Sequence, residues 1–149
     1  MTDLAALVGA ERQGASLLIT RSRLRLFAKA TGQTDPIFVD VAAARAAGHP
    51  DLPAPPTFYF SVDLEAPDPF EWLLEAGVDL GAVLHGEQSF TYHRVAHAGD
   101  ELRTSSTIVD HFTKKEGALE FVVTESRIED TEGCPVATMR QSAVIRRAA

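Results

Sequence analysis

The sequence predicts an α+β domain in which a long antiparallel β-sheet is wrapped around a central helix. Helix signals fill the first half of the chain, whereas from Gln88 onward polar and apolar residues alternate with the period of two that is typical of strands. The strand-like stretches exceed the usual length of about 5–6 residues, so the sheet must coil and needs a filler on its concave face. Because the chain has 149 residues, 45% of them hydrophobic, we expect a single domain over residues 1–149.

Two short helices are expected before residue 50. The first begins after Thr20 and ends before Gly32, because apolar residues recur between them at the helical spacing. The second covers the alanine-rich stretch 41–47, where Asp40 is placed to act as the N-cap. The first of these helices is expected to be small and amphipathic.

The central helix is expected at residues 57–65. The proline-rich loop 49–56 leads into it, and prolines preset the first turn of a helix. The stretch is apolar around most of its circumference, which is typical of a helix that the rest of the protein encloses. A further helix is expected to begin with Asp68 as its N-cap, followed by Pro69 at the first helical position.

The second half of the chain predicts four strands. They are expected to begin at residues 88–93 and to continue at 102–113, 118–130 and 134–146. The segments between the last three contain glycine after charged residues, which is typical of tight turns. The pattern therefore predicts an antiparallel meander whose concave face holds the central helix.

Charge and cysteine content exclude several classes of function. The 21 acidic residues outnumber the 14 basic ones, and a net charge of −7 disfavours nucleic acid as a partner. A single cysteine and five scattered histidines indicate no metal site, and we expect no cofactor. No apolar run approaches the ~20 residues that span a bilayer, and residues 1–10 are acidic where a secretory signal would be basic. We therefore expect a cytoplasmic protein without membrane contact.

Three segments of the chain combine in an order that is typical of one protein family. Residues 30–38 read Ala-Thr-Gly-Gln-Thr-Asp-Pro-Ile-Phe, where hydratases of that family carry Gly-Asp-x-Asn-Pro-apolar-His before a short alanine-rich helix. Residues 52–58 look like the start of the family's central helix, and residues 90–94 and 98–100 are similar to the strand and turn that begin its sheet. On these segments the chain resembles the MaoC-like dehydratases over residues 17–145, which implies a single hot-dog fold.

The departures from that signature decide what the resemblance implies. In the hydratases the Asp and His form the general acid/base pair that moves the Cα proton of an acyl thioester; here Gln33 and Phe38 stand at those positions, and Asp35 replaces the Asn. Neither an amide nor a phenyl ring can carry that proton. The chain is therefore most similar to the N-terminal-type MaoC-like domain and to the non-catalytic subunit of two-subunit (3R)-hydroxyacyl-ACP dehydratases, in which another subunit supplies the pair.

The expected acyl-thioester cleft has four substrate-binding candidates: Gln33, Phe38, Thr57 and Tyr59. Thr57 is the first residue after the prolines whose backbone N–H can face a thioester carbonyl at the start of the helix. The chain's own catalytic residues stay unknown, and three side chains are candidates: Asp35, His49 and His93.

The leading hypothesis is an acyl-thioester-binding protein of an (R)-specific enoyl-CoA hydratase or 3-hydroxyacyl-thioester dehydratase system. It would bind its substrate on CoA or acyl carrier protein, as a homodimer or as a heterodimer with a catalytic MaoC-like subunit. The alternatives are a homodimeric hydratase that recruits other residues, a non-enzymatic acyl-binding module and a hot-dog thioesterase. The sequence leaves the acyl chain length, the carrier and the identity of the partner open.

Overall fold

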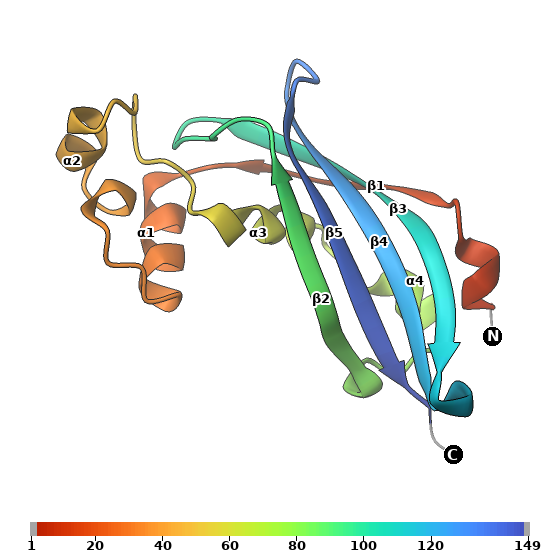
Figure 1. Ribbon diagram of the computed structural model, residues 1–149. Helices are drawn as coiled ribbons and strands as arrows, with labels where there is room; N and C mark the ends of the chain where they lie inside the picture. Colours follow the sequence, from red (N-terminus) through yellow and green to blue (C-terminus); the bar gives the residue numbers. More distant parts are fainter. Residues whose placement is uncertain (1–2, 148–149) are drawn as a thin grey trace.

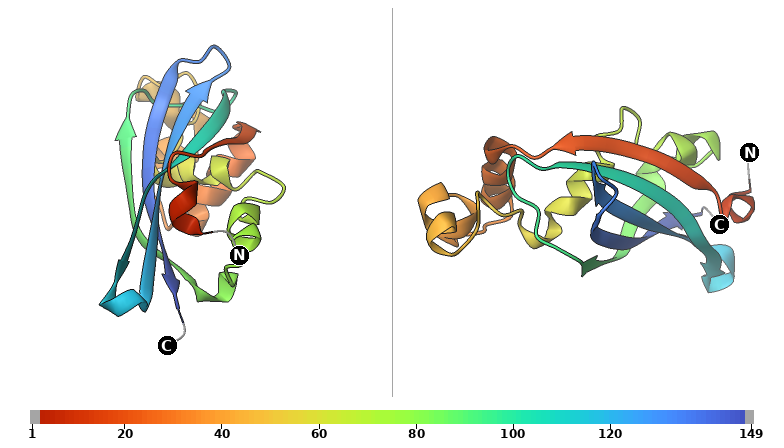
Figure 2. Two further views of the ribbon diagram at one scale, coloured as in Figure 1. Left: turned by 90° about the vertical axis from the view of Figure 1, so that its right-hand side faces the viewer. Right: turned by 90° about the horizontal axis from the view of Figure 1, so that it is seen from above.

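Five antiparallel strands form one sheet in the computed structural model, which describes residues 3–147. The strands lie in the order β1-β3-β4-β5-β2, and the sheet curls around the short helix α3 (Figures 1 and 2). Residues 1–2 and 148–149 of the expected domain lie outside the described residues. The strands are β1 Glu11–Leu18, β2 Val83–Tyr92, β3 Glu101–Lys114, β4 Leu119–Asp130 and β5 Pro135–Arg146.

Short helices fill the concave face of the sheet and cover its ends. Helices α1 and α2 lie together beyond one end, whereas α4 lies toward the other end, beside β3 (Figure 1). The α-helices are α1 Arg21–Ala30, α2 Val41–Ala46, α3 Phe60–Asp63 and α4 Glu71–Glu75. The 3-10 helices are η1 Leu4–Leu7, η2 Pro36–Phe38, η3 Pro56–Tyr59, η4 Leu80–Ala82 and η5 Lys115–Gly117.

Side-chain caps fix the starts of α1 and α2 where the sequence predicts them. The Thr20 hydroxyl accepts a hydrogen bond from the Arg23 N–H at 3.3 Å, and an Asp40 carboxylate oxygen accepts one from the Ala42 N–H at 2.7 Å. Each cap satisfies a backbone donor that the first helical turn leaves without a partner. The predicted positions of both helices are confirmed to within about one residue.

The central helix is shorter than predicted. Residues 57–65 were expected to be one helix, but the chain forms η3 and then α3, which ends at Asp63. Phe58, Tyr59 and Val62 on this segment are buried against side chains from β1, β3, β4 and β5. The filler of the concave face is therefore where the sequence places it, although it provides only about two turns.

Helix α4 begins later than predicted. Asp68 was expected to be the N-cap, but Phe70 occupies that position and no side-chain hydrogen bond caps the helix. The backbone carbonyl of Asp68 instead accepts a hydrogen bond from the Glu71 N–H at 3.2 Å. The Asp-Pro sequence thus forms a turn that precedes the helix, and residues 64–70 cross the concave face as a loop.

The sheet differs from the predicted meander at both edges. Strands β3, β4 and β5 are consecutive neighbours, but β2 pairs with β5 and so lies at the far edge. The other edge is β1, which the sequence analysis did not predict. An edge strand exposes most of its side chains, so the segment that forms β1 carries no polar and apolar alternation to reveal it.

The buried apolar residues fall into two clusters. The first surrounds Phe58 and Tyr59 and includes Leu17, Leu102 and Met139 from the sheet. The second lies under α4 and joins Leu4, Leu73, Val78, Ile108, Val122 and Ile145. The concave face between the two clusters is the part of the fold that holds a cavity.

Candidate functional site

The loop that corresponds to the hydratase signature is held together by its own polar side chains. The Gln33 Oε1 atom accepts a hydrogen bond from the Asp35 N–H at 3.1 Å, and Asp35 Oδ1 accepts one from the Ile37 N–H at 3.1 Å. Asp35 is thereby the cap of η2, and the ring of Phe38 at the end of η2 is half-buried. These interactions shape the loop but place no proton-transferring pair on it.

The two candidates on η3 have different environments. Thr57 is exposed, whereas Tyr59 is only 2% exposed and belongs to the first apolar cluster. The Tyr59 hydroxyl accepts a hydrogen bond from the Ala96 N–H at 3.1 Å, and burial raises the pKa of this phenol. Tyr59 therefore supports the core, and a direct role of Tyr59 or Thr57 in substrate binding stays a prediction.

The two histidine candidates lie in different parts of the fold, and each contacts a different side chain. His49 Nδ1 lies 3.1 Å from His97 Nε2, and burial together with His49 lowers the pKa of His97. His93 is exposed, and its Nε2 lies 3.2 Å from Thr138 Oγ1 on β5. The sequence analysis missed the pairing of His97 with His49, since 48 residues separate them and only the fold brings them together.

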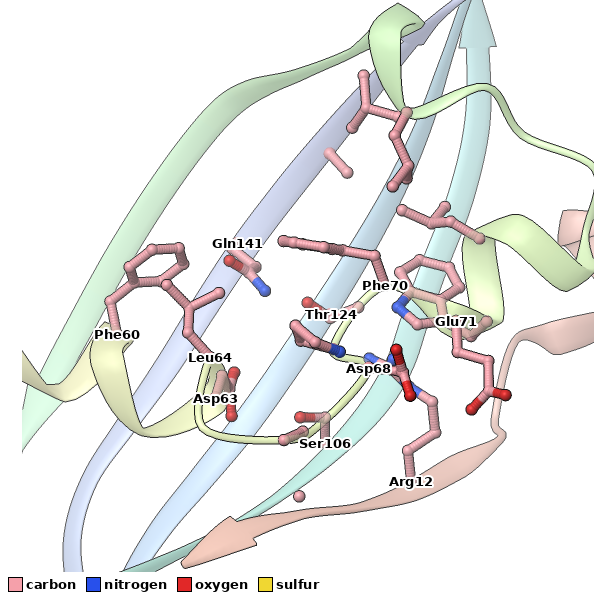
Figure 3. A pocket seen from close by; sticks show the side chains of 18 of the residues that line it. Arg12, Phe60, Asp63, Leu64, Asp68, Phe70, Glu71, Ser106, Thr124 and Gln141 are labelled. Carbon is pink, nitrogen blue, oxygen red and sulfur yellow. The ribbon is translucent and has the colours of Figure 1, made fainter. Parts of the chain in front are cut away.

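A cavity of about 540 Å³ lies on the concave face between the two apolar clusters (Figure 3). Its volume is within the range of about 300–1,000 Å³ that is typical of small-molecule sites. One wall is the sheet, and the opposite wall is formed by α3, the loop 64–70 and α4. None of the seven candidate site residues from the sequence lines this cavity.

Four polar side chains lie side by side on the sheet wall of the cavity. Arg12 from β1, Ser106 from β3, Thr124 from β4 and Gln141 from β5 line it (Figure 3). Pairing of the strands places these residues side by side, because Arg12 is opposite Ser106 and Thr124 is opposite Gln141. Alternate side chains of β4 point toward the concave face, and Thr124 is the next such residue after the apolar Val122. This break in an apolar face was the sequence signal for the site, and the sequence analysis did not use it.

A chain of hydrogen bonds connects α3 to this polar wall. The Ser126 hydroxyl donates to Asp63 Oδ2 at 2.8 Å, and the hydroxyls of Ser126 and Ser106 are 2.9 Å apart. The Arg12 guanidinium stacks on Trp72, with its Cζ atom 4.5 Å from the ring centroid. Burial lowers the pKa of Arg12, and the Asp63 carboxylate opposes that shift. Arg12 has a pKa so far above neutrality that it stays charged.

Three polar atoms of the cavity lining are buried without a hydrogen-bond partner among residues 3–147: Arg12 Nε, Thr124 Oγ1 and Gln141 Oε1. The opposite wall is mostly apolar and includes Phe60, Leu64 and Phe70 (Figure 3). The cavity can therefore hold a molecule that has an apolar part against one wall and a hydrogen-bonding group against the other.

The described residues form neither a metal-binding cluster nor a membrane-spanning helix. Within residues 3–147, no three His, Cys, Asp or Glu side chains are grouped closely enough to bind a metal ion. Over the same residues, none of the helices has the length and hydrophobicity required to cross a membrane. The predicted absence of a cofactor stays a prediction.

A family profile and several curated proteins match the sequence. A family profile described as "FAS1-like, dehydratase domain region" matches residues 6–139. A UPF0336 protein from Leifsonia xyli subsp. xyli is 42% identical over 134 residues, which cover 87% of this chain and 85% of that protein. A UPF0336 protein from Saccharopolyspora erythraea is 37% identical over 128 residues, which cover 86% and 81%.

Solved structures share the fold. A chain described as a MaoC-like dehydratase superposes with a TM-score of 0.82 at 26% identity over 98% of this chain, which spans 44% of that longer chain. The C-terminally truncated HadBC (3R-hydroxyacyl-ACP dehydratase) complex from Mycobacterium tuberculosis gives a TM-score of 0.74 at 22% identity, with 92% and 96% covered. The ChsH1-ChsH2 complex from the same organism gives 0.75 at 23% identity, with 98% and 93% covered. The predicted hot-dog fold is confirmed, and the profile match over most of its length shows that the chain belongs to the FAS1-like dehydratase-domain family.

Proposed function

We propose that the chain is the acyl-thioester-binding subunit of an (R)-specific hydratase or dehydratase, and that a MaoC-like partner subunit supplies the catalytic Asp/His pair. The observation that carries this proposal is the chemistry of the signature loop. Gln33 and Phe38 stand where the pair is expected, and the nearby carboxylate of Asp35 caps η2. A subunit of this kind holds the substrate while another one transfers the proton.

The reaction itself explains why the missing pair matters. Adding water across an enoyl thioester requires a base to activate the water and an acid to protonate Cα. A phenyl ring has no exchangeable proton, and the amide of Gln33 does not titrate near neutral pH. Gln33 can therefore orient a water molecule or a hydroxyl, but the acid/base steps need groups from outside this loop.

The position of the cavity supports a division of labour between subunits. Leu84 and His85 of the edge strand β2 contribute to its lining, so the cavity reaches the edge at which a second hot-dog unit would extend the sheet. Two of the similar solved structures are complexes of two differently named subunits, HadBC and ChsH1-ChsH2. We infer that the acyl chain occupies the cavity of this subunit while its thioester end reaches the partner's catalytic pair.

Reconstitution with a partner tests the proposal. The purified chain is assayed for hydration of crotonyl-CoA and a longer enoyl-CoA, alone and after co-expression with a MaoC-like subunit from the same genome that retains the Asp/His pair. We expect hydration close to background for the chain alone and a rate at least tenfold above that of either subunit for the pair. As a matched control, the partner's pair is removed by Asp→Asn and His→Ala substitutions, and this should abolish the gain.

Two results would contradict the proposal. Robust hydration by the isolated chain would favour a self-sufficient homodimer, and Asp35→Asn, His49→Ala and His93→Ala variants would then identify its base. Release of free CoA thiol from the acyl-CoA without hydration would instead favour a thioesterase. Both results are read from the same reaction mixtures, by absorbance of the enoyl group and by a thiol reagent.

A further inference from the structure

The cavity on the concave face has two chemically different walls. On the sheet side, Arg12, Ser106, Thr124 and Gln141 form a polar stripe that crosses four strands (Figure 3). On the other side, the loop 64–70 and its flanking helices present mostly apolar side chains. A plain hydrocarbon chain would match only one of these walls, since it can make no hydrogen bond to the stripe.

The polar stripe contains groups that lack partners. Thr124 is 4% exposed, and its hydroxyl has no hydrogen-bond partner among the described residues; the same holds for Gln141 Oε1 and Arg12 Nε. Leaving such a group without a partner costs free energy, because its hydrogen bonds to water are lost and not replaced. Thr124 and Gln141 are paired across β4 and β5, and the Thr124 hydroxyl can donate while Gln141 Oε1 accepts, so a group that both donates and accepts satisfies the two together.

The charges around the cavity select against anions. Asp63, Asp68, Glu71 and Glu75 line it, and Arg12 is the cation that faces them. The Arg12 guanidinium is already stacked on Trp72 and lies near the Asp63 carboxylate, which stabilises its charge. A carboxylate brought into this cavity would be repelled by the acidic lining, whereas a neutral hydroxyl would not.

We propose that the cavity selects acyl groups that carry a hydroxyl on the chain beyond the reacting carbons C2 and C3, with that hydroxyl bound to Thr124 and Gln141. This inference rests on the proposed function, because it assigns the acyl chain to this cavity. The hydroxyl donates to Gln141 Oε1 and accepts from the Thr124 hydroxyl, and the rest of the chain lies against Phe60, Leu64 and Phe70.

The chain's single tryptophan makes occupancy of the cavity measurable. Trp72 lines the cavity, so binding there changes its fluorescence, whereas binding elsewhere leaves it unchanged. Affinities are measured by calorimetry for three CoA thioesters at each of three lengths, octanoyl, decanoyl and dodecanoyl: the plain acyl chain, its ω-hydroxy derivative and its ω-carboxy derivative. Fluorescence titrations are run on the same samples.

We expect the ω-hydroxy thioester of at least one length to bind about threefold to tenfold more tightly than the plain chain, as one or two hydrogen bonds would provide. The ω-carboxy derivative should bind most weakly. In the variants Thr124→Val and Gln141→Leu the preference for the hydroxyl should disappear, while the plain chain binds as well as before or better. Thr104→Val is the matched control, because its buried hydroxyl also lacks a partner but does not line the cavity.

Equal affinity for plain and hydroxylated chains at all three lengths would overturn the inference, and so would a preference for the carboxylate. In either case the proposed function stands if the fluorescence of Trp72 still reports binding and the partner still restores hydration. If no thioester binds and the partner restores nothing, the proposed function fails, and the inference fails with it.

Discussion

Ser126 is the residue that ties the central helix to the middle of the sheet. Its side chain is 1% exposed, and its hydroxyl contacts both Asp63 at the end of α3 and Ser106 on the neighbouring strand. The Asp63 carboxylate is half-buried, so a hydrogen-bond donor stabilises its charge, and Ser126 supplies one. The position of Asp63, and hence of the α3 wall of the cavity, depends on this small side chain.

Replacement of Ser126 by alanine should lower the free energy of unfolding by about 1–3 kcal/mol, because the Asp63 carboxylate loses a buried donor. Ser105→Ala is the control, since this residue lies next to Ser106 on β3 but points to the opposite face of the sheet. Urea denaturation of both variants measures the difference. Equal stability of the two would show that Asp63 finds another donor.

His97 should make the fold less stable at mildly acidic pH than at neutral pH. Its pKa is lowered below the usual 6.5 by burial, by the neighbouring His49 and, to a smaller extent, by Arg94, whereas Asp100 and Asp51 raise it. As the pH falls through about 6.5, the unfolded chain therefore binds a proton at this histidine before the folded chain does. The free energy of unfolding should fall between about pH 6.5 and 5, in the direction that a lowered histidine pKa requires.

The variant His97→Gln should flatten this part of the pH profile while leaving the loss of stability below about pH 4 in place, because that loss comes from carboxylates. Asp51 is one of them, since the hydrogen bond from Arg21 holds its pKa well below its usual range. Chemical denaturation at half-unit pH intervals measures both regions. An unchanged slope between pH 6.5 and 5 in the variant would assign the effect to another group.

At the scale of elements, local signals predicted several helix starts and strands whose contacts are made with residues close in sequence. The caps at Thr20 and Asp40 and the strands β3 to β5 follow from residues close in sequence. Two local signals were wrong, since the central helix ends at Asp63 and Asp68 does not cap α4. The errors in the sheet lie where distant segments decide the pairing. Strand β2 pairs with β5 rather than with β3, and β1 forms only because β3 offers it an edge. No periodicity in residues 11–18 could show that.

Gly14 allows β1 to approach β3 closely. A Cβ atom at this position would lie 2.7 Å from the backbone carbonyl oxygen of Thr104 and would also collide with the Thr104 side chain. Gly14→Ala should therefore destabilise the fold by about 1–3 kcal/mol through overpacking and loosen the pairing of β1. Ser16→Ala on the same strand is the control. Hydrogen exchange of the β1 amides checks the local effect, and equal protection in both variants would contradict it.

At the scale of the whole molecule, the candidate site could be predicted only in part. The replacement of the Asp/His pair was visible in the sequence, because Gln33 and Phe38 stand within a recognisable motif. The cavity was not, since it joins Arg12 near the beginning of the chain to Gln141 near its end. Its polar wall follows from strand register, and a shift of one residue would have turned Thr124 to the other face.

The free edge of β2 is where a second subunit should add to the sheet. Leu84 on this strand is 48% exposed, and Leu18 on the opposite edge strand β1 is 55% exposed. Leu84→Arg should therefore prevent association with the partner, or with a second copy, whereas Leu18→Arg should not. Light scattering after size-exclusion chromatography gives the mass of each variant. Loss of association in Leu18→Arg alone would place the interface on β1 instead.

Strand β2 is an edge strand of ten residues, and an uncovered edge of this length affects the solubility of the protein. Its outward amide and carbonyl groups are a template for any other extended polypeptide, including further copies of the same chain. If a partner subunit covers this edge, as proposed above, the complex should stay soluble at higher concentrations than the chain alone, and co-expression should raise the yield of soluble protein.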